Sequence, residues 1–256
     1  YTLDENDFEY KPKVPYPFLH YSVEPELQSQ IGGPDGFFFG SLRLVMDSEL
    51  MINRELSLLG RFSYGLVGNF SEIKLASDSI IEHVRTDIVS YLQEGDKFTI
   101  DRLQFNSFAN PYENFYTKFS AGIFETMFGG YGGEFLYRPF NKNYAIGLEA
   151  WRVRQRDYKQ DLSFRSYETS TGHINFFYRE PNSGVLFVLK GGKYLAGDSG
   201  YTFDVSRKFE TGMRVGAFFS RTDISKEEFG EGAFDKGIYF SIPLDFFSTT
   251  YGKKSF

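Results

Sequence analysis

Residues 237–247, G-I-Y-F-S-I-P-L-D-F-F, alternate between apolar side chains and side chains that are mostly polar or small. Side chains on a β-strand point alternately to its two faces, so an extended segment with this sequence has one fully apolar face. The apolar positions are Ile238, Phe240, Ile242, Leu244 and Phe246. Comparable alternation recurs along the chain about a dozen times, which is typical of a closed barrel with lipid outside and water inside.

The composition agrees with a membrane barrel. Aromatic residues make up 19% of the 256 residues, there is no cysteine, and the mean hydropathy is −0.36. A low mean hydropathy fits such a barrel because half of each strand faces water. A membrane-spanning helix is excluded, since no run of 18 apolar residues occurs. The net charge of −6 gives no indication of nucleic-acid binding, and we expect none.

The chain is predicted to be all-β, a transmembrane antiparallel β-barrel of about 12–14 strands in the bacterial outer membrane, with one inserted helix. Residues 1–17 are polar and rich in proline, and we expect a linker or incoming segment there, followed by the barrel over 18–256. Because residues 252–255 do not alternate before Phe256, we expect the chain to continue beyond 256 to a closing strand. Tyr1 likewise suggests a processed or excised piece. The predicted strands are 18–30, 37–48, 55–67, 98–108, 115–125, 131–140, 144–156, 164–179, 184–196, 200–209, 213–223 and 234–247.

A long insert over 68–97 interrupts the strand pattern, and loops of this length are usually functional or disordered. Within it, apolar residues such as Ile88 and Leu92 recur at helical spacing and predict a helix over 78–93. Two positions fit this helix: an amphipathic element at the rim or membrane interface, or a plug inside the lumen. The residues expected to constrict the lumen in the second case are Val84, Arg85, Asp87 and Tyr91.

The inward faces of the predicted strands carry Ser, Thr, Gln, Asp, Tyr and Arg, which suit sugar hydroxyls or acidic sugars. The arginines could form a basic ladder for a polysaccharide, or they could pair with Asp47, Glu149, Asp157 or Asp204 and brace the lumen. Three tyrosines could stack on sugar rings or serve as packing aromatics. The candidates are Arg43, Arg61, Arg152, Arg154, Arg156, Arg214, Tyr194, Tyr201 and Tyr239.

One predicted strand, 144–156, does not keep a single phase. Ile146 and Leu148 share a face with Arg152, Arg154 and Arg156. Either a β-bulge near Trp151 resets the alternation and turns the arginines inward, or the strand continues beyond the bilayer there.

Two other function classes compete with a polysaccharide-handling barrel. A membrane-embedded hydrolase or acyltransferase needs a nucleophile beside a base, and only His20, His83 and His173 are available. No G-x-S-x-G motif occurs, so we expect a satisfied strand histidine at 173 and no enzyme. No cofactor or metal site is expected, since cysteine and H-E-x-x-H are absent. A soluble all-β binding domain is disfavoured by the continuous apolar outward faces.

Several stretches, taken together, resemble the YjbH family of exopolysaccharide-biosynthesis outer-membrane proteins, which includes the capsule-associated GfcD proteins. The longest of these stretches is F-G-E-G-A-F-D-K-G-I-Y-F-S-I-P-L-D at 229–245. Others are G-G-P-D-G-F at 32–37, V-R-T-D-I from 84, G-G-E-F-L-Y-R-P at 132–139, R-V-R-Q-R-D-Y at 152–158, S-T-G-H at 170–173, K-Y-L-A-G-D at 193–198 and D-V-S-R at 204–207.

The resemblance implies the C-terminal β-barrel region of a larger outer-membrane protein. It also implies a part in secretion or assembly of extracellular polysaccharide or capsule. The expected partners are membrane lipid and lipopolysaccharide, the polysaccharide itself, and periplasmic and lipoprotein components of an export system. A scaffold for a separate export channel fits the same resemblance.

Overall fold

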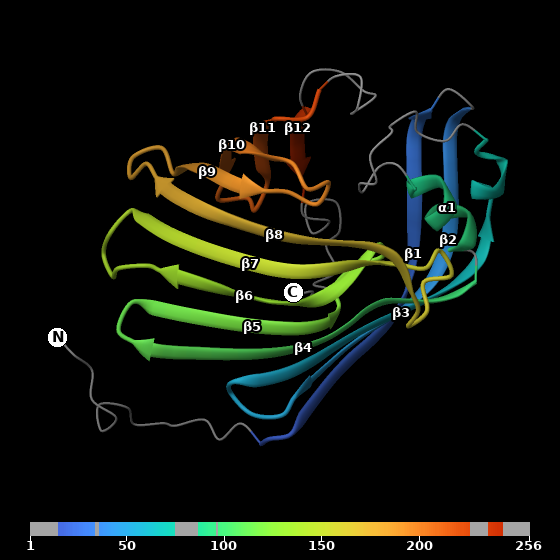
Figure 1. The fold of residues 1–256 in the computed structure, drawn as a ribbon, viewed down its shortest axis with the longest axis horizontal. Coiled ribbons are helices and arrows are strands. Elements are labelled where there is room, and N and C mark those ends of the chain that lie inside the picture. Colours follow the sequence, from blue (N-terminus) through green and yellow to red (C-terminus); the bar gives the residue numbers. More distant parts are fainter. Residues whose placement is uncertain (1–14, 34–35, 75–86, 96, 226–234, 243–256) are drawn as a thin grey trace.

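A computed structural model describes residues 15–33, 36–74, 87–95, 97–225 and 235–242. The described chain forms one sheet of twelve antiparallel strands in which sequence order is also spatial order, and Figure 1 shows that this sheet curves strongly. The strands are β1 (Phe18–Gly33), β2 (Gly36–Met51), β3 (Leu56–Gly68), β4 (Phe98–Tyr112), β5 (Phe115–Ile123), β6 (Phe128–Tyr137), β7 (Tyr144–Arg156), β8 (Phe164–Arg179), β9 (Val185–Lys193), β10 (Ser199–Lys208), β11 (Arg214–Thr222) and β12 (Asp235–Ser241).

The predicted fold class is confirmed, with all twelve strands at the expected positions and every neighbouring pair antiparallel. Each strand pairs with the next along the chain, the simplest connection for antiparallel strands. Within the described residues β1 and β12 each have a single neighbouring strand, so this part of the sheet is open. Residues 1–14 of the expected linker, and residues 243–256 with the end of the predicted strand 234–247, lie outside the described ranges.

The two faces of the sheet have opposite chemistry. On β12, Ile238 and Phe240 are 83% and 72% exposed. On β2 and β4, Ser41 and Thr99 of the other face are 1% and 0% exposed. Soluble proteins show the reverse distribution, with apolar side chains buried and polar ones exposed. We call the exposed apolar side the outer face and the buried polar side the inner face.

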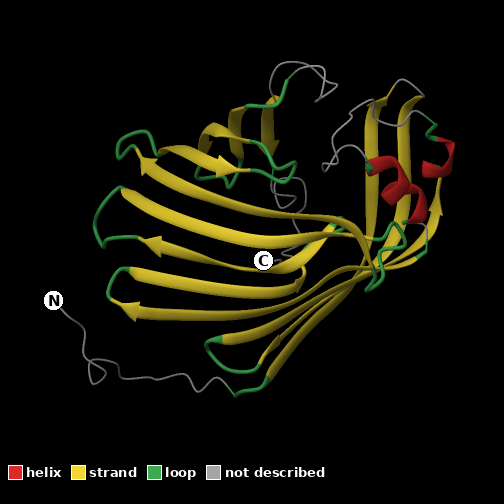
Figure 2. Cartoon of the chain, viewed as in Figure 1, coloured by secondary structure: helices red, strands yellow, loops and turns green. Residues whose placement is uncertain are grey.

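Two helices lie in the insert between β3 and β4 (Figure 2). They are the 3-10 helix η1 (Phe70–Glu72) and α1 (Ile88–Glu94). The predicted helix over 78–93 is confirmed in its second half, whereas residues 75–86 lie outside the described chain. No described helix has the length and apolar composition needed to cross a membrane.

Helix α1 packs on the inner face against strands far apart in the sheet. Leu92 contacts the cluster that contains Phe39 of β2, and Tyr91 contacts the cluster that contains Val153 of β7. Five strand spacings in a flat sheet amount to about 24 Å, whereas a helix of seven residues is about 10 Å long. The sheet therefore has to curve around α1, and its inner face is concave.

The pairing of β7 with its neighbours tests the β-bulge near Trp151 that was one explanation for why its apolar residues and its arginines share a face. Pairing with β6 and β8 continues without a shift through Trp151, and the irregularity lies at Arg154/Arg156. A bulge near Trp151 is therefore the wrong explanation. Arg152 and Arg154 stay on the outer face with Leu148, near the end of the strand where the helices lie.

Candidate functional site

The inner face is the candidate site, and a buried ion pair between β2 and β4 lies near one end of it. Arg43 donates from Nη2 to Oδ1 of Asp101 at 3.1 Å and to Oγ1 of Thr99 at 2.9 Å. Both charged side chains are almost completely buried. Nη1 of Arg43 also donates to Gln28 of β1 at 3.1 Å, so one guanidinium joins three strands. The alternation of β2 explains its inward position.

Arg61 of β3 forms a second, more open charge cluster beside the first. Its Nη1 donates to Asp47 at 3.1 Å, its Nη2 pairs with Glu26, and its Nε lies 3.7 Å from Asp101. The expected pairing of an inward arginine with Asp47 is confirmed at this position. Each of the two arginines therefore has a carboxylate partner, which matches the bracing alternative better than an unpaired basic ladder.

Glu149 of β7 joins two neighbouring strands in the centre of the inner face. Its Oε1 lies 2.8 Å from Nδ1 of His173 on β8 and 2.8 Å from Nζ of Lys190 on β9. Tyr194 follows β9 and presents its ring edge-on to His173, with centroids 4.7 Å apart. The hydroxyl of Tyr194 also lies 2.7 Å from Oγ1 of Thr202. Tyr194 is therefore on the predicted inner side.

A third group spans β10, β11 and β12. The hydroxyl of Tyr239 donates to the carboxylate of Asp204, with distances of 2.9 and 3.0 Å to its two oxygens. Arg214 donates to Oγ of Ser206 at 2.9 Å and lies 5.7 Å from the centre of the Tyr239 ring. Tyr239 and Arg214 thus face inward as predicted, and Tyr239 rather than an arginine binds Asp204.

Four of the candidate contact residues are not on the inner surface. Arg152 and Arg154 lie on the outer face, where Arg152 pairs with Glu168 and Arg154 donates to the carbonyl of Arg165 at 2.6 Å. Tyr201 is also on the outer face. Arg156 is 0% exposed. The inward placement of the three arginines was wrong, because it required a phase reset near Trp151 that the strand pairing does not show. Tyr201 instead packs against the ring of Phe219, which fits the alternative of a packing aromatic.

Arg156 follows the register shift between β7 and β8 and joins separate backbone segments at the end of the sheet. Its guanidinium donates to four backbone carbonyls in three separate segments, with distances of 2.7–3.1 Å. The carbonyls belong to Ile100, Glu125, Thr126 and Asp161. A fully buried side chain bound in this way has a structural role, since no polymer can reach it.

Helix α1 is held on the inner face by polar contacts as well as by packing. Tyr91 donates its hydroxyl to the carbonyl of Arg156 at 2.5 Å, and Gln160 donates to the carbonyl of Tyr91 at 2.8 Å. Asp87 accepts a hydrogen bond from Gln155 at 2.6 Å. Burial raises the pKa of Tyr91, so its phenol stays protonated and able to donate. The other two candidates for the constriction, Val84 and Arg85, fall outside the described chain.

The geometry around His173 does not assemble a nucleophile and base. Nδ1 lies beside Glu149, and Nε2 has no hydrogen-bond partner among the described residues. A catalytic serine or threonine would be within hydrogen-bond reach of that nitrogen. In the described chain no three His, Asp or Glu side chains are grouped to hold a metal ion.

The sequence reasoning missed Asp101 and Lys190 as partners of inner-face charges. Both alternate inward on their strands, so the period-two pattern contained a signal for each. Which charged residues they pair with depends on the strand register. Near Asp101 that register changes, because a one-residue shift occurs beside Arg61.

Comparison with known proteins identifies the family. The family model described as exopolysaccharide biosynthesis protein YbjH matches residues 5–255. The chain belongs to the YjbH family. It is 36% identical over 236 residues to a protein of Escherichia coli (strain K12) described as the uncharacterized lipoprotein YjbH. This match covers 90% of the chain and 34% of that protein, so the chain spans about a third of the relative's length.

A search of solved structures also returns a loop-deletion mutant of OmpT, an outer membrane protein of Vibrio cholerae. The alignment covers 88% of this YjbH-family chain and 99% of that chain, at 12% sequence identity and a TM-score of 0.31. A likeness at this level supports no inference.

Proposed function

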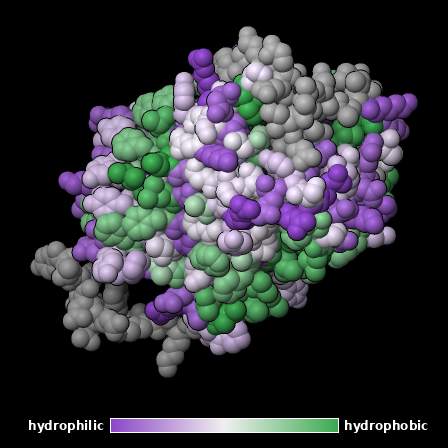
Figure 3. All heavy atoms as spheres, in the orientation of Figure 1, coloured by the Kyte–Doolittle hydropathy of each residue, from purple (hydrophilic) through white to green (hydrophobic). Residues whose placement is uncertain are grey.

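We propose that this chain is the membrane-spanning wall of an outer-membrane protein that takes part in exopolysaccharide or capsule secretion without catalysing a reaction. The observation that carries the proposal is the inverted sheet, with exposed apolar side chains outside and buried polar side chains inside. An apolar surface that extends over twelve strands needs lipid as its solvent. Figure 3 shows hydrophobic side chains gathered in two areas of this view, one at the left and one below the centre. The description of the YjbH family model supplies the link to exopolysaccharide.

The connections between strands support one orientation in the membrane. At one end of the sheet they are short, at 52–55, 113–114, 138–143, 180–184 and 209–213. The other end carries the 69–97 segment with α1 and the 157–163 connection, beside the short connections 124–127 and 194–198. Bacterial outer-membrane barrels have short periplasmic turns and longer extracellular loops. The short-turn end therefore faces the periplasm in this proposal, and α1 lies toward the cell surface.

The contacts of α1 favour a plug over a position at the membrane interface. The helix packs on the inner faces of strands as far apart in the sheet as β2 and β7, and it buries Tyr91 and Leu92. An interfacial helix would instead keep its apolar side toward lipid. In this proposal α1 narrows the lumen, and the polymer is held or guided along a wall of paired charges.

The proposed role predicts that deletion of the full-length protein lowers surface polysaccharide while polymer synthesis in the cytoplasm continues. Cell-surface and intracellular polymer are measured in the same culture, with the intact protein supplied in trans as the control. Unchanged surface polysaccharide would contradict the proposal. The plug has a separate test: removal of residues 78–93 should raise single-channel conductance in a planar bilayer, and unchanged conductance would contradict it.

A further inference from the structure

A pocket of about 430 Å³ opens on the inner face at the short-turn end of β6, β7 and β8. Its apolar wall consists of Leu136, Ala145, Phe177 and Leu186. Strand register places all four on the inner face, so the pocket faces the lumen and not the lipid. This volume lies in the range of pockets that bind small molecules or single residues of a polymer.

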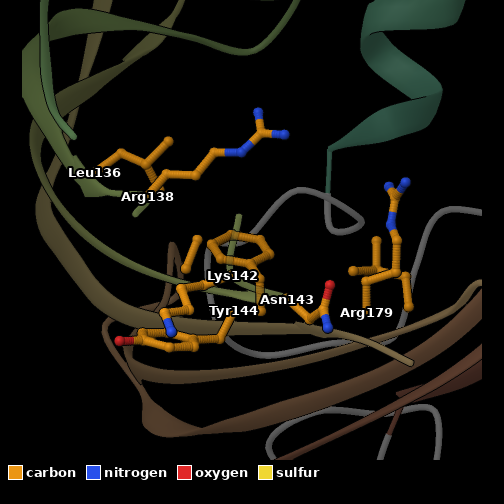
Figure 4. A pocket seen from close by; sticks show the side chains of 9 residues that line it. Leu136, Arg138, Lys142, Asn143, Tyr144 and Arg179 are labelled. Carbon is orange, nitrogen blue, oxygen red and sulfur yellow. The ribbon is translucent and has the colours of Figure 1, made fainter. Parts of the chain in front are cut away.

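Three cationic side chains line the same pocket. Arg138 follows β6, Lys142 precedes β7, and Arg179 ends β8. Figure 4 shows the side chains of Arg138 and Arg179 in the upper part of the view, with Lys142, Asn143 and Tyr144 below them. Elsewhere on the inner face Arg43, Arg61, Lys118 and Lys190 each have a carboxylate within salt-bridge distance.

Arg138, Lys142 and Arg179 have no carboxylate partner in the described part of the chain. For Arg179, the position of the acid next to it in sequence explains this. Glu180 directly follows Arg179 but turns away into its own hairpin. It accepts hydrogen bonds from the backbone of Asn182 at 3.0 Å and from the backbone and hydroxyl of Ser183 at 2.5 Å. The guanidinium groups of Arg138 and Arg179 therefore line one pocket without a carboxylate partner among the described residues, and Lys142 adds a third positive charge to its lining.

Backbone hydrogen bonds hold Arg138 and Arg179 in place without using their side chains. The amide of Arg179 donates to the carbonyl of Asn143 at 2.7 Å, which joins two of the segments that line the pocket. The amide of Arg138 donates to the carbonyl of Asn114 at 2.8 Å, and the side chain of Asn114 accepts from Phe140 at 2.8 Å. The guanidinium groups thus remain available on a preorganised frame.

We propose that this pocket binds a carboxylate-bearing sugar residue of an acidic polysaccharide at the periplasmic mouth. The inference rests on the proposed function and names the substrate class for it. An arginine fork binds a carboxylate through two parallel hydrogen bonds. The Asn143 amide offers a donor and an acceptor for sugar hydroxyls. Phe177, on the inner face, adds aromatic surface beside the charges.

The test compares binding of two labelled probes to the purified full-length protein in detergent: an oligogalacturonate, which carries carboxylates, and a maltooligosaccharide of the same length, which is neutral. We expect selective binding of the oligogalacturonate. The double variant Arg138→Gln/Arg179→Gln should lose at least tenfold in affinity for it. The matched control is Arg152→Gln/Arg154→Gln, which removes two charges from the outer face and should bind as the parent does. Retained barrel folding of each variant is verified by heat-modifiable migration in gels.

Equal binding of both probes, or equal oligogalacturonate affinity in the parent and the pocket variant, would overturn the inference. Competition by inorganic phosphate as strong as competition by galacturonate would reduce the site to a general anion pocket and would also overturn it. The proposed function has its own readout in surface polysaccharide after deletion. Reduced surface polysaccharide together with unaltered probe binding in the pocket variant would refute this inference alone.

Discussion

The hydroxyl of Tyr91 in α1 donates to the backbone carbonyl of Arg156 at the end of β7, at a distance of 2.5 Å. The two residues are 65 positions apart in sequence, and both side chains are almost completely buried. Tyr91→Phe would leave that carbonyl without its partner, which typically costs about 1–3 kcal/mol. We therefore expect faster amide hydrogen exchange in α1 and a lower urea midpoint.

The control for Tyr91→Phe is Tyr112→Phe, which removes the same hydroxyl from a side chain that is 75% exposed. That change should leave both measurements within error of the parent. If the two variants behaved alike, the hydrogen bond to Arg156 would not be what holds the helix on the inner face.

For the Arg43–Asp101 pair, we expect a single substitution to lower the unfolding free energy much more than a double substitution does. Asp101→Asn removes the carboxylate and leaves the buried Arg43 uncompensated, which we expect to cost about 3–5 kcal/mol of unfolding free energy. Replacing both residues with apolar ones of similar size, Arg43→Met/Asp101→Leu, should cost much less because no unpaired charge remains. Urea unfolding in micelles measures both.

An exposed pair provides the comparison for these variants. Lys97 and Glu94 are also in contact, at 2.8 Å, but their side chains are 75% and 39% exposed. Glu94→Gln should lower the unfolding free energy by less than about 1 kcal/mol. If Asp101→Asn lowered the unfolding free energy by as little, solvent would be screening the Arg43–Asp101 pair, and the pair would not stabilise the sheet.

Because of Glu180, the stability of the hairpin between β8 and β9 should depend on pH. Hydrogen bonds from Ser183 and Asn182 lower the pKa of Glu180 from its ordinary value of 4.5 to about 2. Because the folded pKa is the lower one, the stabilisation is complete above about pH 4.5 and is lost as the pH falls toward 2. Hydrogen exchange of the Ser183 amide, corrected for intrinsic rates, should lose protection over that interval.

Glu180→Gln should abolish this pH dependence while the exchange of amides in the middle of β8 stays as in the parent. Glu168→Gln, at the other end of the same strand, is the matched control and should preserve the protection change at Ser183. Protection that stayed constant between pH 2 and 4.5 in the parent would contradict the role assigned to the carboxylate.

The strands and their faces could be predicted from the sequence because alternation is a local property. Phe38, Leu42 and Leu44 repeat every second or fourth residue and therefore share the outer face of β2. The position of Arg156 could not be predicted in this way, because a register shift between β7 and β8 at Arg154/Arg156 determines it. Helix periodicity likewise predicted α1 but not which strands it contacts, since those contacts depend on the curvature of the whole sheet.

The pocket was missed for a related reason. Arg138 and Lys142 lie in the turn between β6 and β7, and Arg179 is the last residue of β8 before the next turn. Nothing in their local sequence distinguishes them from ordinary solvated residues. The pairing of β7 with β8 brings these turns together, and the capping contacts of Glu180 leave Arg179 without an acid partner. The strand pairing and the Glu180 contacts both depend on the tertiary structure, whereas the period-two pattern indicates only which face a residue occupies.

Adjacent residues of β8 allow a direct test of whether the outer face contacts lipid. Ile174 lies on the outer face and is largely exposed, whereas Asn175 lies on the inner face, next in sequence and at nearly the same depth. An arginine on the lipid face near the bilayer midplane costs about 2–4 kcal/mol, and one in the lumen is far better tolerated. Ile174→Arg should therefore destabilise the protein by that amount when folding into lipid vesicles is followed by urea titration. Asn175→Arg should be much milder, since Glu149 lies on the same face of the neighbouring strand. Equal losses for the two variants, or a larger loss for Asn175→Arg, would mean that the exposed apolar face does not contact lipid.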